Sequence, residues 1–90
     1  MSCVLGLSEA AIARLATMPL TLQEEVLDEL DRLADDPSGL RVRGVPPTAV
    51  HDFTRAEGDV VHYVFAHIEP DVPANTLRVL AIGLVTRHVT

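Results

Sequence analysis

The second half of the chain collects the side chains that could move protons and hold an anion. Imidazoles titrate near neutral pH and can act as general acids or bases, and guanidinium groups bind phosphate and carboxylate oxygens. Because we predict strands over this half, these side chains could hold a phosphodiester on one sheet. The alternative is that they are polar positions on the solvated face of that sheet. The residues are His51, His62, His67, His88, Arg55, Arg78 and Arg87.

A second group of candidates lies in residues 39–44, where two glycines have the spacing of a phosphate-binding loop. The Lys-Ser/Thr pair of such a loop is missing, and no helix signal follows, so the pattern excludes nucleotide binding here. Arg41 and Arg43 remain as two donors for a phosphate or a carboxylate. The alternative interpretation is an ordinary solvated loop.

The spacing of the histidines and the lone cysteine argues against a metal site, and we predict neither a metal nor another cofactor. His62 and His67 are five residues apart, so on one strand they face opposite sides. The chain has no His-x-His or Cys-x-x-Cys unit. Cys3 reads as a core residue, and the aromatic side chains of Phe53, Tyr63 and Phe65 are expected to be core rather than base-stacking platforms.

Charge is distributed unevenly along the 90 residues, which carry a formal net charge of −6. Residues 1–36 account for all of it, whereas residues 37–90 balance five acids with five arginines. This negative total disfavours general binding of nucleic acids, but it does not exclude a local patch of Arg and His that binds an anion. A single cysteine, no apolar run long enough to span a bilayer and no cationic leader predict one cytoplasmic domain over residues 1–90.

The elements that would position these groups follow from hydrophobic periodicity and turn signals. We expect a short strand at residues 4–7, a helix at 9–17 capped by Ser8, and a second helix that begins at a Thr21–Glu24 capping box and ends before Pro37. Residues 40–47 read as a connector, and whether they pair with the sheet is left open. Three strands are expected at residues 48–55, 60–68 and 76–85.

The order β-α-α-β-β-β predicts an α+β fold in which a helical hairpin packs on one face of an antiparallel sheet. Short connections between the last three strands predict a meander. The apolar stripe of the hairpin should be buried against the sheet, and the other face of the second helix is acidic. The predicted core residues are Ile12, Leu15, Leu22, Val26, Leu30 and Leu33.

The same order resembles the RelE/ParE superfamily of bacterial toxins. The segments similar to the family's two helices, to its Gly-Asp hairpin and to its final Val-Leu-x-Ile-Gly strand are residues 8–19, 26–37, 58–65 and 79–83. The resemblance implies the β-α-α-β-β-β fold, a cytoplasmic type II toxin and a protein antitoxin as partner. It also implies a target, either the ribosome with its mRNA or DNA gyrase, and it leaves a homo-oligomer open.

Departures from the family pattern bear on activity. The family's hairpin arginine falls on Val61 and its His-Arg pair on Leu84 and Val85, whereas Arg87 and His88 follow three residues later. If metal-independent ribonuclease chemistry is retained, the resemblance assigns His88 as acid or base and Arg87 and Arg78 as charge stabilisers. The substrate contacts would be Arg55, Tyr63, Arg41 and Arg43. Loss of the nuclease set favours the alternative, a non-catalytic binding module on the same scaffold that is directed at gyrase or at a regulatory partner.

Overall fold

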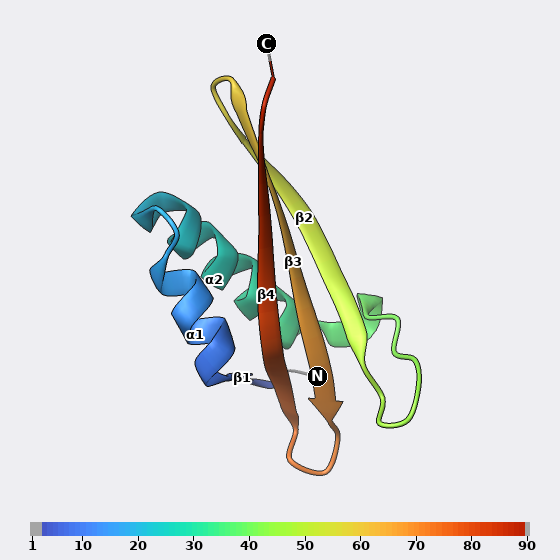
Figure 1. The fold of residues 1–90 in the computed structure, drawn as a ribbon. Coiled ribbons are helices and arrows are strands. Elements are labelled where there is room, and N and C mark those ends of the chain that lie inside the picture. Colours follow the sequence, from blue (N-terminus) through green and yellow to red (C-terminus); the bar gives the residue numbers. More distant parts are fainter. Residues whose placement is uncertain (1–2, 90) are drawn as a thin grey trace.

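The computed structural model describes residues 3–89 and confirms the predicted order of elements (Figure 1). Both helices lie on one side of a four-stranded sheet, as the prediction of an α+β fold requires. The molecule is elongated, with extents of 46 × 22 × 22 Å. The elements are β1 (Val4–Leu7), α1 (Glu9–Ala16), α2 (Leu20–Asp35), the 3-10 helix η1 (Pro37–Gly39), β2 (Ala49–Glu57), β3 (Val60–Asp71) and β4 (Thr76–His88).

The sheet has the strand order β1-β4-β3-β2 and is mixed rather than antiparallel throughout. Strands β2, β3 and β4 form the predicted antiparallel meander. β1, however, pairs in parallel with β4, from Val4 opposite Thr76 to Leu7 opposite Val79. The two helices return the chain over the sheet, and two reversals of direction then bring β4 alongside β1 with the same orientation.

The long strands β3 and β4 both extend beyond the ends predicted from the sequence. β3 continues to Asp71 and β4 to His88, because the register holds from Asp71 opposite Thr76 to Val60 opposite His88. The pairing has one β-bulge, between His67 and Ile68, where β4 contains one residue that has no register partner on β3. At the other end, Gly58 turns β2 into β3 with a φ of 59°, a conformation that residues with a side chain rarely adopt.

The N-terminal cap predicted for α1 is confirmed, and the one predicted for α2 is not. Ser8 caps α1, and its hydroxyl accepts a hydrogen bond from the Ala11 amide at 3.1 Å. The predicted capping box of α2 is wrong: the helix begins at Leu20, its N-cap is Pro19, and no side chain caps it. The Pro19 carbonyl already accepts the Gln23 amide at 2.9 Å, which places Thr21 inside the first turn.

The core forms between the apolar stripe of the helices and one face of the sheet, as predicted for five of six helical positions. The correction is Ile12, which is 54% exposed. On the short α1 the contact surface is taken by Ala11 and Leu15, and the neighbouring position points away from the sheet. The sheet contributes Val64, Ala66, Ile68, Leu77, Val79 and Ile82 to this core.

The other face of the sheet carries the alternate residues of the same strands. We call it the open face, because α1 and α2 both lie on the opposite side (Figure 1). Tyr63 and Phe65 belong to it, so the expectation that both are core residues is wrong: Tyr63 is 39% exposed and Phe65 is half-buried. Phe53 alone of the three aromatic residues packs against the core. In residues 3–89, no helix is long and apolar enough to cross a membrane.

Candidate functional site

The three residues assigned to catalysis by resemblance all lie on β4, but the strand separates them. Arg78 and Arg87 are nine residues apart, which corresponds to about 30 Å along a strand. Arg78 pairs with the carboxylate of Glu69, its cross-strand neighbour. Arg87 and His88 are consecutive, so their side chains leave opposite faces of the sheet. The structure therefore does not bring the three side chains to one substrate.

Arg87 lies on the open face directly opposite Val61, the position where the family resemblance expects a cation. Cross-strand partners in an antiparallel pair project from the same face with Cβ atoms about 5 Å apart. Tyr63, two residues along β3, lies on that face as the partner of Val85. In residues 3–89, Arg87 makes no ion pair within 4.0 Å, so its guanidinium remains available to an anion.

At the centre of the open face, Phe65 lies between its two register partners, Gly83 on β4 and the exposed Asp52 on β2. Phe65 is the register partner of Gly83, and a Cβ atom at Gly83 would overlap the Phe65 ring. The ring thus lies across the glycine, and His67 meets its edge with ring planes at 83° and centroids 6.4 Å apart. This arrangement offers stacking and apolar contact, but it places no cation at the centre of the face.

The contacts of Arg55 place it on the helix side, at the seam between α2 and β2. Its Nε lies 3.3 Å from a Glu25 carboxylate oxygen, and its Nη2 lies 3.6 Å from Glu29. The guanidinium also sits 5.0 Å from the centroid of the Phe53 ring. Two carboxylates therefore neutralise the cation that the sequence offered as a substrate contact.

The residue that organises this seam is Glu29, which the sequence placed on the exposed acidic face of the second helix. It is only 9% exposed. Its Oε1 lies 3.2 Å from His51 Nε2 and 3.7 Å from Arg32 Nη2, in addition to the Arg55 contact. The spacing carried a signal, because Glu29 is seven residues after Leu22 and three after Val26, both on the buried stripe.

The remaining histidines have separate environments. His62 is buried on the helix side, where its Nδ1 lies 3.0 Å from the Thr86 hydroxyl. His67 is exposed on the open face, as the five-residue separation predicted. His88, the partner of Val60, is exposed near the end of β4. Within residues 3–89, no three His, Cys, Asp or Glu side chains gather as a metal site would require.

Arg41 and Arg43 lie outside the sheet, in the segment between η1 and β2. They line a hollow of about 310 Å³ together with Thr48, Ala49 and Val50. The backbone of this segment is fixed by an isolated bridge in which Arg43 and Thr48 exchange two hydrogen bonds of 2.8 and 2.9 Å. The connector therefore pairs with itself rather than with the sheet.

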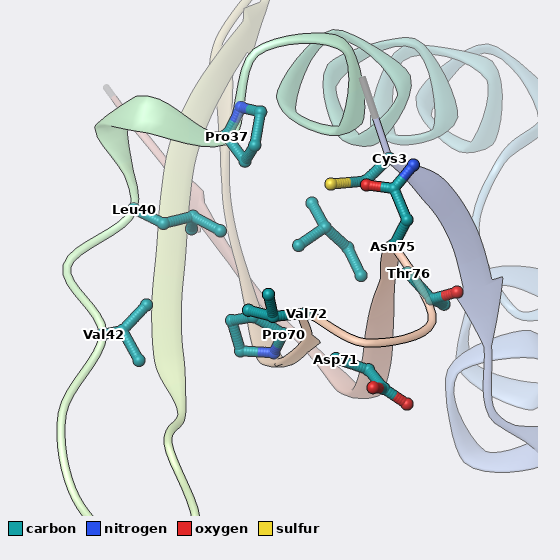
Figure 2. Close-up of a pocket in the computed structure, with 10 residues that line it drawn as sticks. Cys3, Pro37, Leu40, Val42, Pro70, Asp71, Val72, Asn75 and Thr76 are labelled. Carbon is teal, nitrogen blue, oxygen red and sulfur yellow. The ribbon is translucent and has the colours of Figure 1, made fainter. Parts of the chain in front are cut away.

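An apolar groove lies on the other side of the same segment (Figure 2). Its volume is about 280 Å³, and side chains from the residue before β1, from η1 and the segment after it, and from the β3–β4 connection with its flanking strand ends meet there. Cys3 points its sulfur toward the groove and also packs against the core. The other lining residues are Pro37, Leu40, Val42, Pro70, Asp71, Val72, Asn75, Thr76 and Leu77.

The end of α2 carries a carboxylate with an altered pKa. Asp36 accepts a hydrogen bond from the Ser38 hydroxyl at 2.7 Å and one from the Ser38 amide at 3.3 Å. Both bonds favour the ionised form, so they hold the pKa of Asp36 below its ordinary value. The pair closes the turn into η1.

Comparison with known proteins identifies the fold. No family model and no curated protein matches the sequence. Among solved structures, a mutant of the E. coli toxin RelE in the free state superposes with a TM-score of 0.72 and 16% identity, over 92% of this chain and 83% of that one. The intact E. coli RelBE toxin–antitoxin complex gives 0.69 and 17%, over 91% and 95%. The archaeal RelE–RelB complex from Pyrococcus horikoshii OT3 gives 0.58 and 13%, over 91% and 93%.

These likenesses show that the chain has a RelE-like fold, as the sequence resemblance predicted. At this level of identity they establish the fold alone.

Proposed function

We propose that this protein is a cytoplasmic, toxin-like component of a type II toxin–antitoxin pair, bound by a protein antitoxin. The observation that carries the proposal is the RelE-like fold, which extends over 92% of the chain. Two of the similar structures are complexes of RelE with RelB, which supports a protein partner. The partner would be a small protein, and the acidic surface of α2 favours one that presents lysines or arginines.

We further propose that the nuclease chemistry of this scaffold is weak or lost. Cleavage of RNA by its own 2′-hydroxyl needs a group that moves the proton and a cation for the negative charge that develops on the phosphorane oxygens. On the open face Val61 provides no charge, and Arg78 is already paired with Glu69. Arg87 is the remaining candidate cation there, while His88 projects from the opposite face.

A non-catalytic binding module on the same scaffold, directed at gyrase or at a regulatory protein, is the second candidate. The Phe65 ring over Gly83 favours it, because an aromatic side chain on a sheet face suits protein contact better than phosphate binding. In both cases the protein acts through a partner, and the two candidates differ in whether RNA is cut.

The test is co-expression with any small protein that an adjacent gene encodes. The proposal predicts a stoichiometric complex that survives gel filtration, with a growth effect of the chain, if any, relieved by the partner. An adjacent product that never associates with the chain, together with no growth effect, would contradict the toxin–antitoxin assignment. Relief without association would place the effect elsewhere and contradict it equally.

A further inference from the structure

We propose that the Arg41–Arg43 hollow is a docking site for an extended, acidic and apolar segment of a protein partner. The inference deepens the proposed partner-binding function and rests on it. It concerns a hollow on the segment that connects η1 to β2, which reaches the open face at Val50, the register partner of His67. The argument uses the direction of alternate side chains, the unpaired charge and the exposed apolar residues around the hollow.

Alternation along the segment separates its apolar side chains from its charged ones. Leu40 and Val42 line the apolar groove, where Figure 2 shows them on the chain that forms its wall. Arg41 and Arg43 line the hollow on the other side. Leu40 also packs against the core, and Arg43 is bridged to Thr48, so the backbone is held at both ends. The two guanidinium groups are therefore presented from a fixed extended backbone.

These arginines have no acidic partner in the part of the chain that the structure describes. Every ion pair found there involves Arg32, His51, Arg55 or Arg78 instead. Two cations that share one hollow in a protein of net charge −6 form a local exception to its acidic surface. Charge complementarity therefore favours a ligand that carries carboxylates or phosphates.

Apolar exposure around the hollow favours a peptide over a nucleic acid. Val50 lines the hollow and is 58% exposed, and the nearby loop residue Val45 is 100% exposed. A peptide can cover such side chains with its own apolar residues, whereas a phosphate backbone cannot. The net charge of −6 also repels a polyanion at longer range.

The spacing of the two arginines suggests the pattern of the ligand. Residues two apart on an extended chain lie about 6.6 Å from each other on the same side. An extended partner segment repeats its side chains at the same interval, so two acidic residues separated by one apolar residue match both guanidinium groups. The exposed Thr48 hydroxyl, which donates to the Arg43 carbonyl at 3.4 Å, can still accept a hydrogen bond from a ligand amide at the same hollow.

The experiment measures binding of a fluorescein-labelled Glu-Leu-Glu-Leu-Glu peptide by fluorescence anisotropy at increasing salt. The wild-type chain should bind it with an affinity that falls as salt rises. The double variant R41A/R43A should bind about tenfold more weakly, the loss expected for two exposed ion pairs. R14A removes another exposed arginine without an ion pair, on α1, and should behave as wild type. Circular dichroism checks that each variant keeps its fold.

Three outcomes would overturn the inference: no binding of the acidic peptide, equal binding by R41A/R43A, or tighter binding of a short single-stranded RNA that the same double variant loses. The last result would assign the hollow to nucleic acid. The adjacent-gene complex separates this inference from the proposed function. Absence of any complex with the wild-type chain contradicts the proposed function, whereas a complex that R41A/R43A forms equally well contradicts only the docking site.

Discussion

Replacement of Leu30 by alanine tests the packing of α2 on the sheet. Leu30 is 1% exposed and belongs to the core cluster that joins the helices to β3 and β4. Leucine and alanine have similar helix propensities, so the change removes packing rather than helix formation. We expect a loss of roughly 2–5 kcal/mol in the free energy of unfolding, from lost apolar burial and the cavity left behind.

That loss is large for a chain of this size. At about 0.05–0.15 kcal/mol per residue, a chain of 90 residues has a total stability of roughly 5–13 kcal/mol. The melting temperature should fall by about 10 °C or more, since 1 kcal/mol shifts a small domain by about 4–8 °C. Urea titration followed by far-UV circular dichroism measures the change directly, and an unchanged slope confirms that both proteins unfold in the same way.

The matched control is Ile12→Ala, on the exposed side of α1. Because Ile12 is 54% exposed, its truncation should change stability by no more than about 0.5 kcal/mol. An unfolding midpoint unaffected by Leu30→Ala would refute the assignment of the buried face. A larger loss from Ile12→Ala than from Leu30→Ala would show that the helices are rotated relative to the sheet.

Three further predictions concern the open face, the end of α2 and the acidic surface. Gly83→Ala should destabilise the protein by about 1–3 kcal/mol because the new methyl group overlaps the Phe65 ring, and the cost should shrink in a Phe65→Ala background; equal costs in both backgrounds would contradict that contact. In Ser38→Ala, carboxyl NMR should show the pKa of Asp36 rising toward its ordinary value, and the stability lost as pH falls through the folded-state pKa should diminish; an unmoved titration would exclude the Ser38 hydroxyl as a cause of the lowered pKa. Association with a partner that presents lysines or arginines to the acidic surface of α2 should slow as salt increases, and a rate independent of salt would remove the α2 surface from the interface.

Sequence periodicity predicted the elements well because their apolar patterns are regular. The stripe that includes Leu22, Val26 and Leu30 identified α2 and its buried face, and the Gly58 turn identified the β2–β3 hairpin. The predicted start of α2 was wrong because both Pro19 and Thr21 are plausible N-cap residues, and the local sequence does not decide between them. The prediction that Ile12 is buried was wrong because α1 has only two turns, which leave few positions in contact with the sheet.

The candidate site was less predictable because it depends on which strand face each residue occupies. Arg87 and His88 would have been assigned to opposite faces had the last strand been extended to residue 88 rather than ended at residue 85. Arg55 looked free in sequence, and only the docking of α2 over β2 brings Glu25 and Glu29 to it. Such pairings join residues far apart in the chain, which periodicity alone does not reveal.

Cleavage of mRNA on translating ribosomes by the purified protein tests the central claim most directly: that a RelE-like scaffold here has lost most of its nuclease chemistry. Loss of one electrostatic donor typically costs about 10²–10³ in rate, and Val61 stands where the family resemblance expects one such donor. Primer extension, with a RelE-type ribonuclease as positive control, should therefore show feeble cleavage or none. Robust codon-specific cleavage that is abolished by Arg87→Ala or His88→Ala would contradict the account and show that the residues near the end of β4 have taken over the site.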